Sequence, residues 1–540
     1  MRAQKGEGGR DFDVLVVGAG LAGLYALHRL RGLGLSVRVL EAGDGVGGTW
    51  FWNRYPGARC DIESMEYSYQ FSEELQQEWE WTERFASQSE ILDYINHVAE
   101  RFDLRRDIQL ETRVEEARFD ERENRWTLRT DGGEELSASF CVMATGCLSH
   151  RNTPEFEGLS SFRGERFHTG NWPREKIDFG GKRVGVIGTG SSGVQLTPLV
   201  AQEAEHLYVF QRTPNFSVPA HNRPLEPEEQ RRIKAEYAAF RRRNYESFFG
   251  TQVDILSQAP ESAMDLSPEE RMRHFEAAWA RGGPGFLNTF DDLLINRASN
   301  DAAVEFNYRK IREIVEDPQV AEKLLPKQTF GCKRICVDTN YFEIFNRANV
   351  TLVDVSENAI GKITPEGLEL ANGEAFALDM VVFATGFDAM TGALLAIDPV
   401  GVSGLTLHEK WAEGPRTYLG LGVNGFPNLF TITGPGSPSV LSNMVPAIEQ
   451  HVNWIADCIG YLEEKGFTRI EARADAEEAW RVHVNELADT TLYPSCHSWY
   501  VGTNIPGKPR VFMPYLGFHP YVQKCDEVAM KAYEGFELRR

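Results

Sequence analysis

The sequence has few cysteines for its length. Eight cysteines occur in 540 residues. None belongs to a Cys-x-x-Cys motif or to a Cys/His cluster with metal-ligand spacing, which argues against a paired redox-active thiol and against a metal site. Because a chain of this length does not need disulfides for stability, we expect all eight cysteines to be reduced thiols in a cytoplasmic protein.

Long apolar runs and an excess of positive charge are also missing. No run approaches the ~18 residues of a membrane-spanning helix, so we expect no membrane partner. Residues 1–11 are charged and glycine-rich, unlike a signal peptide, and we expect a flexible tail there. The formal net charge of −22 argues against nucleic acid as a partner, since phosphate backbones need a basic surface. Nothing in the sequence points to an obligate protein partner.

Two Gly-x-Gly-x-x-Gly clusters are present. The first follows an apolar strand at residues 14–17 and precedes a helical pattern, a second strand and Glu41. This order predicts a dinucleotide site, in which the glycines allow a tight turn and close approach to a pyrophosphate and the acid binds a ribose hydroxyl. A further glycine turn at residues 45–48 is typical of flavoproteins and favours FAD. The glycines of this FAD cluster are Gly18, Gly20 and Gly23.

The second cluster repeats the pattern after a strand at residues 184–187. The next strand ends in Arg212-Thr213 instead of an acid. Because arginine binds a 2′-phosphate that an acid would repel, NADP is favoured over NAD, and Lys333 is a second candidate phosphate contact. The predicted NADP residues in this cluster and its helix are Gly188, Thr189, Gly190, Ser191, Ser192, Gly193 and Gln195.

Two matching strand ends help to divide the chain. The sequence Ala-Thr-Gly occurs at residues 144–146 and 384–386 and indicates where the chain leaves and re-enters a nucleotide-binding domain. We predict an α/β fold with two Rossmann-like dinucleotide-binding domains, for FAD and NADP, and a mostly helical insertion. The predicted boundaries are 12–150 and 381–540 for the FAD domain, 151–223 and 331–380 for the NADP domain, and 224–330 for the insertion, with a mobile loop near 498–510.

Two dinucleotide sites in one chain predict electron transfer from NADPH to FAD and then to an acceptor. Without a paired cysteine motif, that acceptor is oxygen, a quinone or an electron-transfer protein. The stretch FRGERFHTGNWP at residues 162–173 narrows the choice. It resembles the F-x-G-x-x-x-H-x-x-x-W-P fingerprint of the type I Baeyer–Villiger monooxygenases at every fixed position, which are Phe162, Gly164, His168, Trp172 and Pro173.

The resemblance extends along nearly the whole chain. Residues 52–64, 383–394, 434–444 and 498–513 are similar to the phenylacetone monooxygenase branch of that family, with steroid and cyclohexanone monooxygenases as relatives. It implies a monooxygenase with non-covalently bound FAD that uses NADPH and O2 to insert one oxygen atom beside a ketone carbonyl. The expected product is an ester or a lactone, and the fingerprint is implied to couple the domains and not to touch substrate.

The resemblance also implies residue roles. Arg334 matches the arginine that stabilises the peroxyflavin anion, and a guanidinium suits this task because it stays charged at working pH. It is implied to contact NADP as well, and Asp61 matches the carboxylate that pairs with it near the flavin. Trp499 matches a mobile-loop residue that closes over the nicotinamide half of NADP. Flavin contacts are implied at Thr49, Trp50, Tyr67, Val114 and Met444, and pocket walls at Leu148, Ile335, Ser439, Val440 and Leu441.

Three alternatives stay open on the sequence. A flavin monooxygenase for sulfides or amines would not need Arg334, and an NADPH oxidase or quinone reductase would release its electrons without forming an ester. A non-catalytic NADP sensor would bind both nucleotides without bleaching the flavin. The ketone also stays open between aryl, cyclic and steroid-size substrates, since Gly517 is single where close relatives carry a Gly-Gly pair near the pocket.

Overall fold

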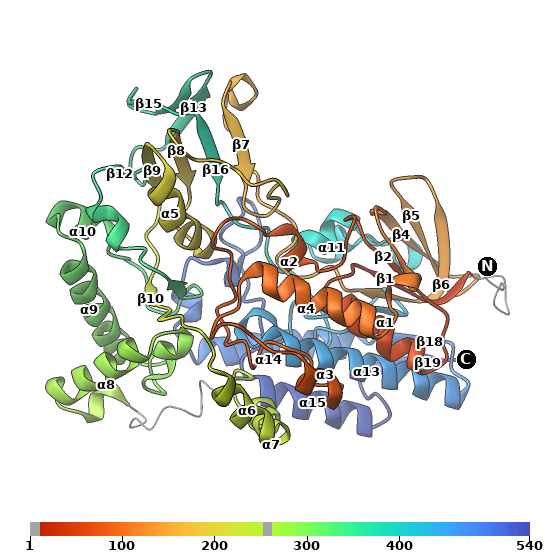
Figure 1. The fold of residues 1–540 in the computed structure, drawn as a ribbon. Coiled ribbons are helices and arrows are strands. Elements are labelled where there is room, and N and C mark those ends of the chain that lie inside the picture. The colour runs from red at the N-terminus through yellow and green to blue at the C-terminus, as the bar shows by residue number, and fades with distance from the viewer. Residues whose placement is uncertain (1–10, 252–261) are drawn as a thin grey trace.

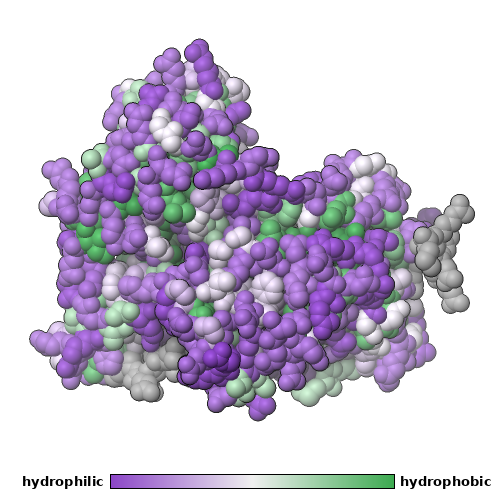
Figure 2. Space-filling model, in the orientation of Figure 1, coloured by the Kyte–Doolittle hydropathy of each residue, from purple (hydrophilic) through white to green (hydrophobic). Residues whose placement is uncertain are grey.

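The computed structural model describes residues 11–251 and 262–540. Residues 1–10 of the predicted tail therefore lie outside the described residues. Figure 1 shows two sheet-containing lobes side by side, with helices from the C-terminal part of the chain beneath them. Within the described residues, no helix is long and apolar enough to cross a membrane. The face drawn in Figure 2 is largely hydrophilic, and its apolar side chains form separate small areas.

The first lobe contains a seven-stranded sheet of order β3-β2-β1-β6-β5-β4, and β17 also pairs with β6. The strands β1, β2, β3, β6 and β17 run parallel, whereas β4, β5 and β6 form an antiparallel meander. Strand β1 and the start of the following helix are buried, as expected for a nucleotide-binding unit. The strands are β1 (Phe12–Val17), β2 (Val37–Leu40), β3 (Ile108–Gln109), β4 (Val114–Asp120), β5 (Arg125–Thr130), β6 (Glu135–Met143) and β17 (Leu429–Thr431).

The second lobe contains a five-stranded parallel sheet of order β12-β9-β8-β16-β7. Its strands are β7 (Glu165–His168), β8 (Arg183–Ile187), β9 (His206–Gln211), β12 (Val350–Asp354) and β16 (Met380–Phe383). The predicted boundary at residue 380 falls inside β16, which pairs with β7 and β8. Smaller sheets are formed by β13 (Ile360–Thr364), β14 (Gly367–Leu370) and β15 (Ala375–Ala377), by β10 (Ser217–Pro219) and β11 (Cys336–Asp338), and by β18 (Arg469–Ala472) and β19 (Phe536–Arg539).

The described part of the predicted insertion is helical. Its own apolar core contains Phe275, Phe286, Phe306 and Phe330, and the rings of Phe286 and Phe330 pack edge to face. This core supports the loop that leads to Arg334. The helices are α6 (Pro227–Ala235), α7 (Tyr237–Glu246), α8 (Pro268–Arg281), α9 (Arg297–Ile314) and α10 (Pro318–Leu324).

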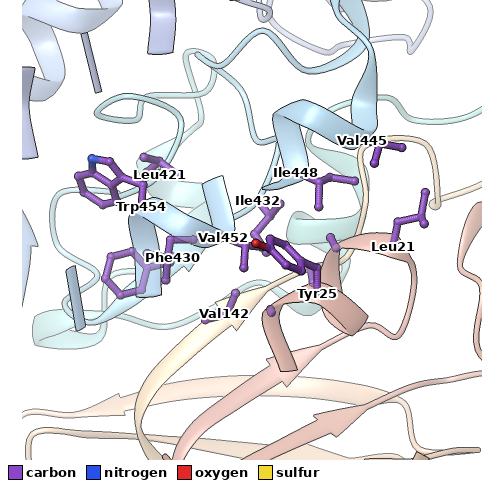
Figure 3. Close-up of a cluster of buried hydrophobic side chains, with 14 of the residues drawn as sticks. Leu21, Tyr25, Val142, Leu421, Phe430, Ile432, Val445, Ile448, Val452 and Trp454 are labelled. Atoms are coloured by element: carbon purple, nitrogen blue, oxygen red, sulfur yellow. The ribbon is translucent and has the colours of Figure 1, made fainter. Parts of the chain in front are cut away.

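Long helix α13 (Met444–Lys465) packs against α1 (Leu21–Gly32) and the sheet of the first lobe. Figure 3 shows Leu21 and Tyr25 of α1 facing Val445 and Ile448 of α13. The C-terminal part of the chain thus completes the core of the first lobe. The remaining helices are α2 (Thr49–Trp52), α3 (Glu73–Glu78), α4 (Gln88–Arg101), α5 (Ser191–Glu203), α11 (Gly392–Ile397), α12 (Leu407–Lys410), α14 (Ala474–Asp489) and α15 (Phe518–Met530).

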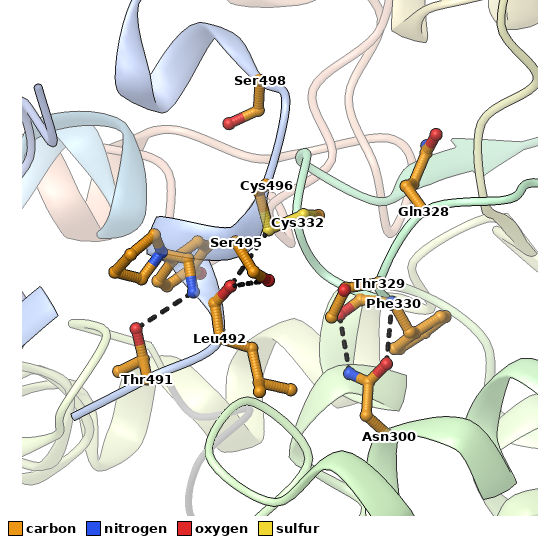
Figure 4. The surroundings of a disulfide bond; sticks show 12 residues. Asn300, Gln328, Thr329, Phe330, Cys332, Thr491, Leu492, Ser495, Cys496 and Ser498 are labelled. Carbon is orange, nitrogen blue, oxygen red and sulfur yellow. Dashed lines mark hydrogen bonds between the residues drawn. A yellow bond between two sulfur atoms is a disulfide. The ribbon is translucent and has the colours of Figure 1, made fainter. Parts of the chain in front are cut away.

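The expectation that all cysteines are reduced is wrong. Cys332 and Cys496 form a disulfide, with Cα atoms 5.7 Å apart and a sequence separation of 164. Figure 4 shows that they come from two separate loops. This pairing could not be predicted from the sequence, because the two loops are brought together only by tertiary packing beside α9. The other six cysteines are free and buried.

Glu449 on α13 is a buried carboxyl whose ionisation opposes folding. Its Oε1 accepts hydrogen bonds from the backbone N–H groups of Gln70 (2.8 Å) and Phe71 (3.0 Å). Burial raises the pKa of Glu449 to about 7, against the lowering effect of these bonds and of Arg241. The folded protein thus holds this proton more tightly than the unfolded chain does. The associated stability is present below pH ~4.5 and is lost as the pH rises through about 7.

We predict that Glu449→Gln removes this pH dependence. As the pH rises from 5 to 8, the difference between the free energy of unfolding of the variant and that of the parent should increase in favour of the variant, by up to about 3 kcal/mol. Urea unfolding at several pH values measures the difference. The control is Glu464→Gln on the same helix, where the side chain is 69% exposed and no such gain is expected. Parallel pH profiles for the parent and Glu449→Gln would contradict the prediction.

Candidate active site

A cavity of about 1510 Å³ is lined by residues of both lobes. Gly18 and Gly20 line it from the first lobe, and Ser191, Ser192 and Gln195 line it from the second. These residues follow β1 and β8, so the cavity lies beyond the carboxyl ends of parallel strands. This is the usual ligand position in open α/β sheets.

The first glycine cluster forms a cradle that side chains would fill. Gly18 has φ +103°, and a Cβ there would lie 2.6 Å from the carbonyl oxygen of Ala144. A Cβ on Gly23 would lie 1.8 Å from the oxygen of Gly18. No side chain caps the N-terminus of α1, which leaves backbone N–H groups for an anion. These residues fit the pyrophosphate of a dinucleotide.

Glu41 lies beside this cradle at the end of β2 and lines the cavity. Its carboxylate accepts hydrogen bonds from the N–H groups of Ala19 (2.7 Å) and Gly43 (2.8 Å). Burial raises the pKa of Glu41, and the two backbone hydrogen bonds oppose that rise. Each carboxylate oxygen can accept a further bond, so both remain available to a ribose hydroxyl.

The second cluster repeats the construction. Gly188 has φ +111°, and a Cβ there would lie 2.4 Å from the oxygen of Ala384. A Cβ on Gly193 would lie 2.2 Å from the oxygen of Gly188, and no side chain caps the N-terminus of α5. Ala144 and Ala384 open the two Ala-Thr-Gly sequences, so each of these marks the packing partner of one cradle. The second cradle also fits a dinucleotide.

Arg334 and Asp61 form a two-bond ion pair at the cavity wall. The Nε and Nη2 groups of Arg334 donate to the Asp61 carboxylate over 2.6 and 2.7 Å, and Nη1 donates to the carbonyl of Val440 over 2.9 Å. A guanidinium carries five N–H groups, so two are left for a reacting group. Arg334 is 31% exposed and Asp61 20%, and both line the cavity.

The charge of Arg334 is secure in this setting. Burial lowers the pKa of Arg334, but attraction to Asp61 and the hydrogen bonds between them outweigh burial, so the pKa is raised overall. An unpaired arginine at this depth would be costly. The arrangement therefore presents a fixed positive charge, oriented by a carboxylate, to whatever occupies the cavity.

A hydrogen-bond relay connects the loop of Asp61 to the second lobe. The side-chain N–H of Gln195 donates to the carbonyl of Arg59 over 3.0 Å, and the Tyr55 hydroxyl donates to the Gln195 oxygen over 2.8 Å. The loop also approaches α5 closely, since a Cβ on Gly57 would lie 2.5 Å from the oxygen of Gln195. Gln195 thus holds the Asp61 loop in place.

We predict that Tyr55→Phe slows product formation by roughly 2- to 10-fold, the effect of one hydrogen bond of about 0.5–1.5 kcal/mol. The loss of the Tyr55 hydroxyl leaves Gln195 freer and Asp61 less well oriented. Steady-state turnover and the flavin content of the purified protein measure the effect, and flavin content should stay unchanged. Tyr461→Phe on α13 is the control. Equal turnover of Tyr55→Phe and the parent would show that the relay does not matter.

The fingerprint stretch lies beside the cavity and connects the lobes. His168 ends β7, where its Nδ1 accepts from the N–H of Gly170 (2.9 Å) and its Nε2 lies 3.2 Å from the oxygen of Asn152. Burial lowers the pKa of His168, which favours the neutral ring. The backbone N–H of Trp172 donates to the carbonyl of Trp52 over 3.3 Å. None of the five fingerprint residues lines the cavity, whereas the intervening Gly170 and Asn171 do.

Comparison with known proteins decides the family. The family described as pyridine nucleotide-disulphide oxidoreductase matches residues 15–277. A Baeyer–Villiger monooxygenase of Pseudooceanicola batsensis is 45% identical over 532 residues, which cover 97% of this chain and 96% of that protein. This chain is a member of the Baeyer–Villiger monooxygenase family.

Other members of the family agree. An acetone monooxygenase (methyl acetate-forming) of Gordonia sp. is 42% identical over 530 residues, covering 97% of this chain and 99% of that protein. The solved structure of an oxidised steroid monooxygenase bound to NADP is 52% identical, with a TM-score of 0.93 over 98% of this chain and 99% of that chain. The predicted α/β fold with two nucleotide-binding domains is confirmed.

The cavity of this Baeyer–Villiger monooxygenase collects many of the predicted residues, but not all. Those that line it are Gly18, Gly20, Glu41, Thr49, Trp50, Asp61, Tyr67, Val114, Leu148, Ser191, Ser192, Gln195, Arg334, Val440, Met444 and Trp499. The predicted cofactor and substrate residues that do not line it are Gly23, Gly188, Thr189, Gly190, Gly193, Arg212, Thr213, Lys333, Ile335, Ser439 and Leu441. Burial lowers the pKa of Lys333, and the positive charge of nearby Arg212 lowers it further.

Residues 496–508 of this Baeyer–Villiger monooxygenase form a segment around Trp499, which we call the Trp499 segment. The contacts that attach this segment to the rest of the protein were not predicted from the sequence. The Lys508 ammonium donates to Asp388 (2.5 Å) and to the carbonyl of Ala389 (2.7 Å), and Asn504 donates to the carbonyl of Phe387 (2.8 Å). All five residues belong to segments that resemble the family, and this resemblance was the available signal. Tyr55 of the relay likewise lies within residues 52–64, which resemble the family.

Proposed function

We propose that Arg334 and Asp61 form the catalytic pair of an NADPH- and O2-dependent oxidation that inserts one oxygen atom beside a ketone carbonyl. The product is an ester or a lactone. The observation that carries the assignment is the two-bond ion pair, which lies at a cavity lined both by the first glycine cradle and by the start of α5, the helix that follows the second cradle. A fixed guanidinium is the group that carbonyl chemistry of this kind requires, since negative charge develops on oxygen during the reaction.

The cofactors are FAD and NADP. When bound, FAD supplies the oxygen-activating group and NADPH the hydride. In our proposal the first cradle and Glu41 hold FAD, while the second cradle holds NADP with Arg212 and Lys333 as the cations for its 2′-phosphate. Further flavin contacts are proposed at Thr49, Trp50, Tyr67, Val114 and Met444. Further NADP contacts are proposed at Ser191, Ser192, Gln195, Arg334 and Trp499.

Arg334 stabilises negative charge through the two N–H groups that Asp61 and Val440 leave free. A preorganised donor of this kind contributes about 10²–10³ in rate. Asp61 orients the guanidinium and keeps it charged. The relay through Gln195 holds the loop of Asp61 in a fixed position relative to the second lobe. Arg334 supplies the positive charge, and Asp61 and Gln195 fix its position. None of these residues needs to exchange a proton.

The Trp499 segment covers the cavity, and exclusion of water there strengthens the field of Arg334. Trp499 and Ile505 both line the cavity, as do Leu148 and Val440 from the proposed substrate walls. These apolar side chains favour an apolar ketone. We further propose a cytoplasmic site of action, supported by the six free cysteines, with which one disulfide is compatible because the disulfides of cytosolic proteins are usually redox-responsive.

The test uses a mixed panel of aryl, cyclic and steroid-size ketones with NADPH and ¹⁸O-labelled oxygen gas. Mass spectrometry should find an ester or lactone that is heavier than its ketone by one ¹⁸O atom. Oxidation of NADPH without any labelled ester from the panel would contradict the proposal and favour an oxidase. A labelled sulfoxide from an added sulfide, without labelled ester, would favour the sulfide monooxygenase instead.

A further inference from the structure

A disulfide connects the loop of Arg334 to the segment of Trp499. Cys332 lies two residues before Arg334, and Cys496 lies three residues before Trp499. Arg334 and Trp499 line the same cavity. Figure 4 shows the bond between the two loops, with Asn300 of α9 hydrogen-bonded to Phe330 below it. The crosslink therefore joins two walls of the proposed active site.

Non-covalent contacts hold the two loops together independently of the disulfide. Arg297 of α9 donates to Thr329 Oγ1 over 2.8 Å and to Ser495 Oγ over 3.4 Å, so one side chain bridges both loops. Asn300 donates to the carbonyl of Phe330 over 2.9 Å and accepts from its N–H over 3.0 Å. Two thiols at these positions would therefore stay close enough to pair again.

The disulfide anchors one end of the Trp499 segment. At the far end, Lys508 and Asn504 attach the segment to residues 387–389. At the near end, Cys496 is covalently bound to the Arg334 loop. Both sulfur-bearing residues are buried, but the neighbours of Cys496, which are Ser495 and His497, are exposed. The chain on both sides of Cys496 is therefore in contact with solvent.

We propose that Cys332 and Cys496 form a reversible thiol–disulfide site that takes a dithiol as reductant and a peroxide as oxidant. In the disulfide form, the site holds the Trp499 segment over the cavity. In the dithiol form, the segment opens more often and NADP is held less tightly. The inference rests on the proposed function, because that assigns the segment to cover bound NADP.

The chemistry of the site balances with these two reagents. A thiolate of the reductant attacks one sulfur, which breaks the bond between the cysteines and releases the other cysteine as a thiol. The second thiol of the reductant then attacks the mixed disulfide and releases the first cysteine. Two cysteine thiols and one oxidised reductant result. In the reverse direction, one cysteine thiolate attacks hydrogen peroxide to give a sulfenic acid, and the second cysteine displaces water from it. The two thiols supply two electrons and two protons, and the peroxide becomes two waters.

The test compares FAD-loaded protein before and after treatment with dithiothreitol. Iodoacetamide labelling after denaturation, followed by mass spectrometry, should find Cys332 and Cys496 unlabelled before treatment and labelled after it. Flavin fluorescence then measures the Kd of NADP⁺. This Kd should rise roughly three- to tenfold on reduction, as the closed population falls to between about a third and a tenth. Hydrogen peroxide should restore both the protection from labelling and the lower Kd.

Variants separate this effect from general damage by the reductant. Cys332→Ser and Cys496→Ser should each show the higher Kd without treatment and no response to dithiothreitol. Cys458→Ala, in α13 and away from the cavity, should respond like the parent. Labelling of both cysteines before treatment, or an unchanged Kd after their reduction, would overturn the inference. Neither readout needs ketone turnover, so failure of the proposed function would appear separately as a lack of labelled ester.

Discussion

Replacing Arg334 by lysine or alanine should lower ester formation by about 10²–10³-fold, while NADPH still bleaches the bound flavin. Lysine carries one compact charge on a flexible stem. It cannot make the two-bond contact to Asp61, the bond to Val440 and two further bonds at once. Alanine also leaves Asp61 without its partner. Gas chromatography of the ester and anaerobic absorbance of the flavin measure the two steps separately.

The matched control is Arg183→Lys. Arg183 also makes a two-bond contact to a carboxylate, that of Asp379, over 3.1 and 3.0 Å, but it lies on the second lobe away from the cavity. Ester formation by this variant should stay within about twofold of the parent, because an exposed ion pair contributes little. Sulfide oxidation that survives in Arg334→Ala would further assign the arginine to the attack on the carbonyl. Undiminished ester formation by Arg334→Lys would refute the assigned role.

Gly18→Ala and Gly188→Ala should each remove one cofactor. Gly18→Ala should purify without yellow colour, because the added Cβ would lie 2.6 Å from Ala144 O at a positive φ. Gly188→Ala should keep its flavin, but its KM for NADPH should rise by about 10²-fold, from strain of roughly 3 kcal/mol. Absorbance of the purified protein and steady-state kinetics in NADPH measure the two losses.

Gly32→Ala is the control for both substitutions. Gly32 ends α1, has no atom within 4 Å of its added Cβ and does not have a positive φ. It should keep full flavin content and the KM of the parent. Equal loss of flavin in Gly18→Ala and Gly188→Ala would mean that the two cradles do not serve separate nucleotides.

The parts of the fold that were predictable from sequence are those that local chemistry determines. Each cradle is a strand, a glycine turn and a helix within one short stretch, so its residue pattern is sufficient. The fold class, the cofactors and the family are confirmed on that basis. The individual site residues stay predictions, although the cavity brings Asp61, Arg334 and Trp499 together.

Features that depend on contacts between distant segments were not predictable. The disulfide forms because two loops lie together beside α9, and the spacing of the cysteines in the sequence does not indicate that these loops are neighbours. The relay from Tyr55 through Gln195 to Arg59 crosses between lobes. The position of β16 is a third case, because only its pairing with β7 and β8 assigns residues 381–383 to the second lobe. Each feature is a consequence of tertiary packing.

The pairing of β17 with β6 has a consequence for synthesis on the ribosome. Residues 429–431 complete a sheet whose other strands end by residue 143, and α13 follows them into the same core. At about 5–20 residues per second, the nascent N-terminal part waits roughly 15 to 60 seconds for its missing strand. During that interval one side of β6 has no partner at residues 141–143, so the growing chain is a natural client for chaperones that shield strand edges.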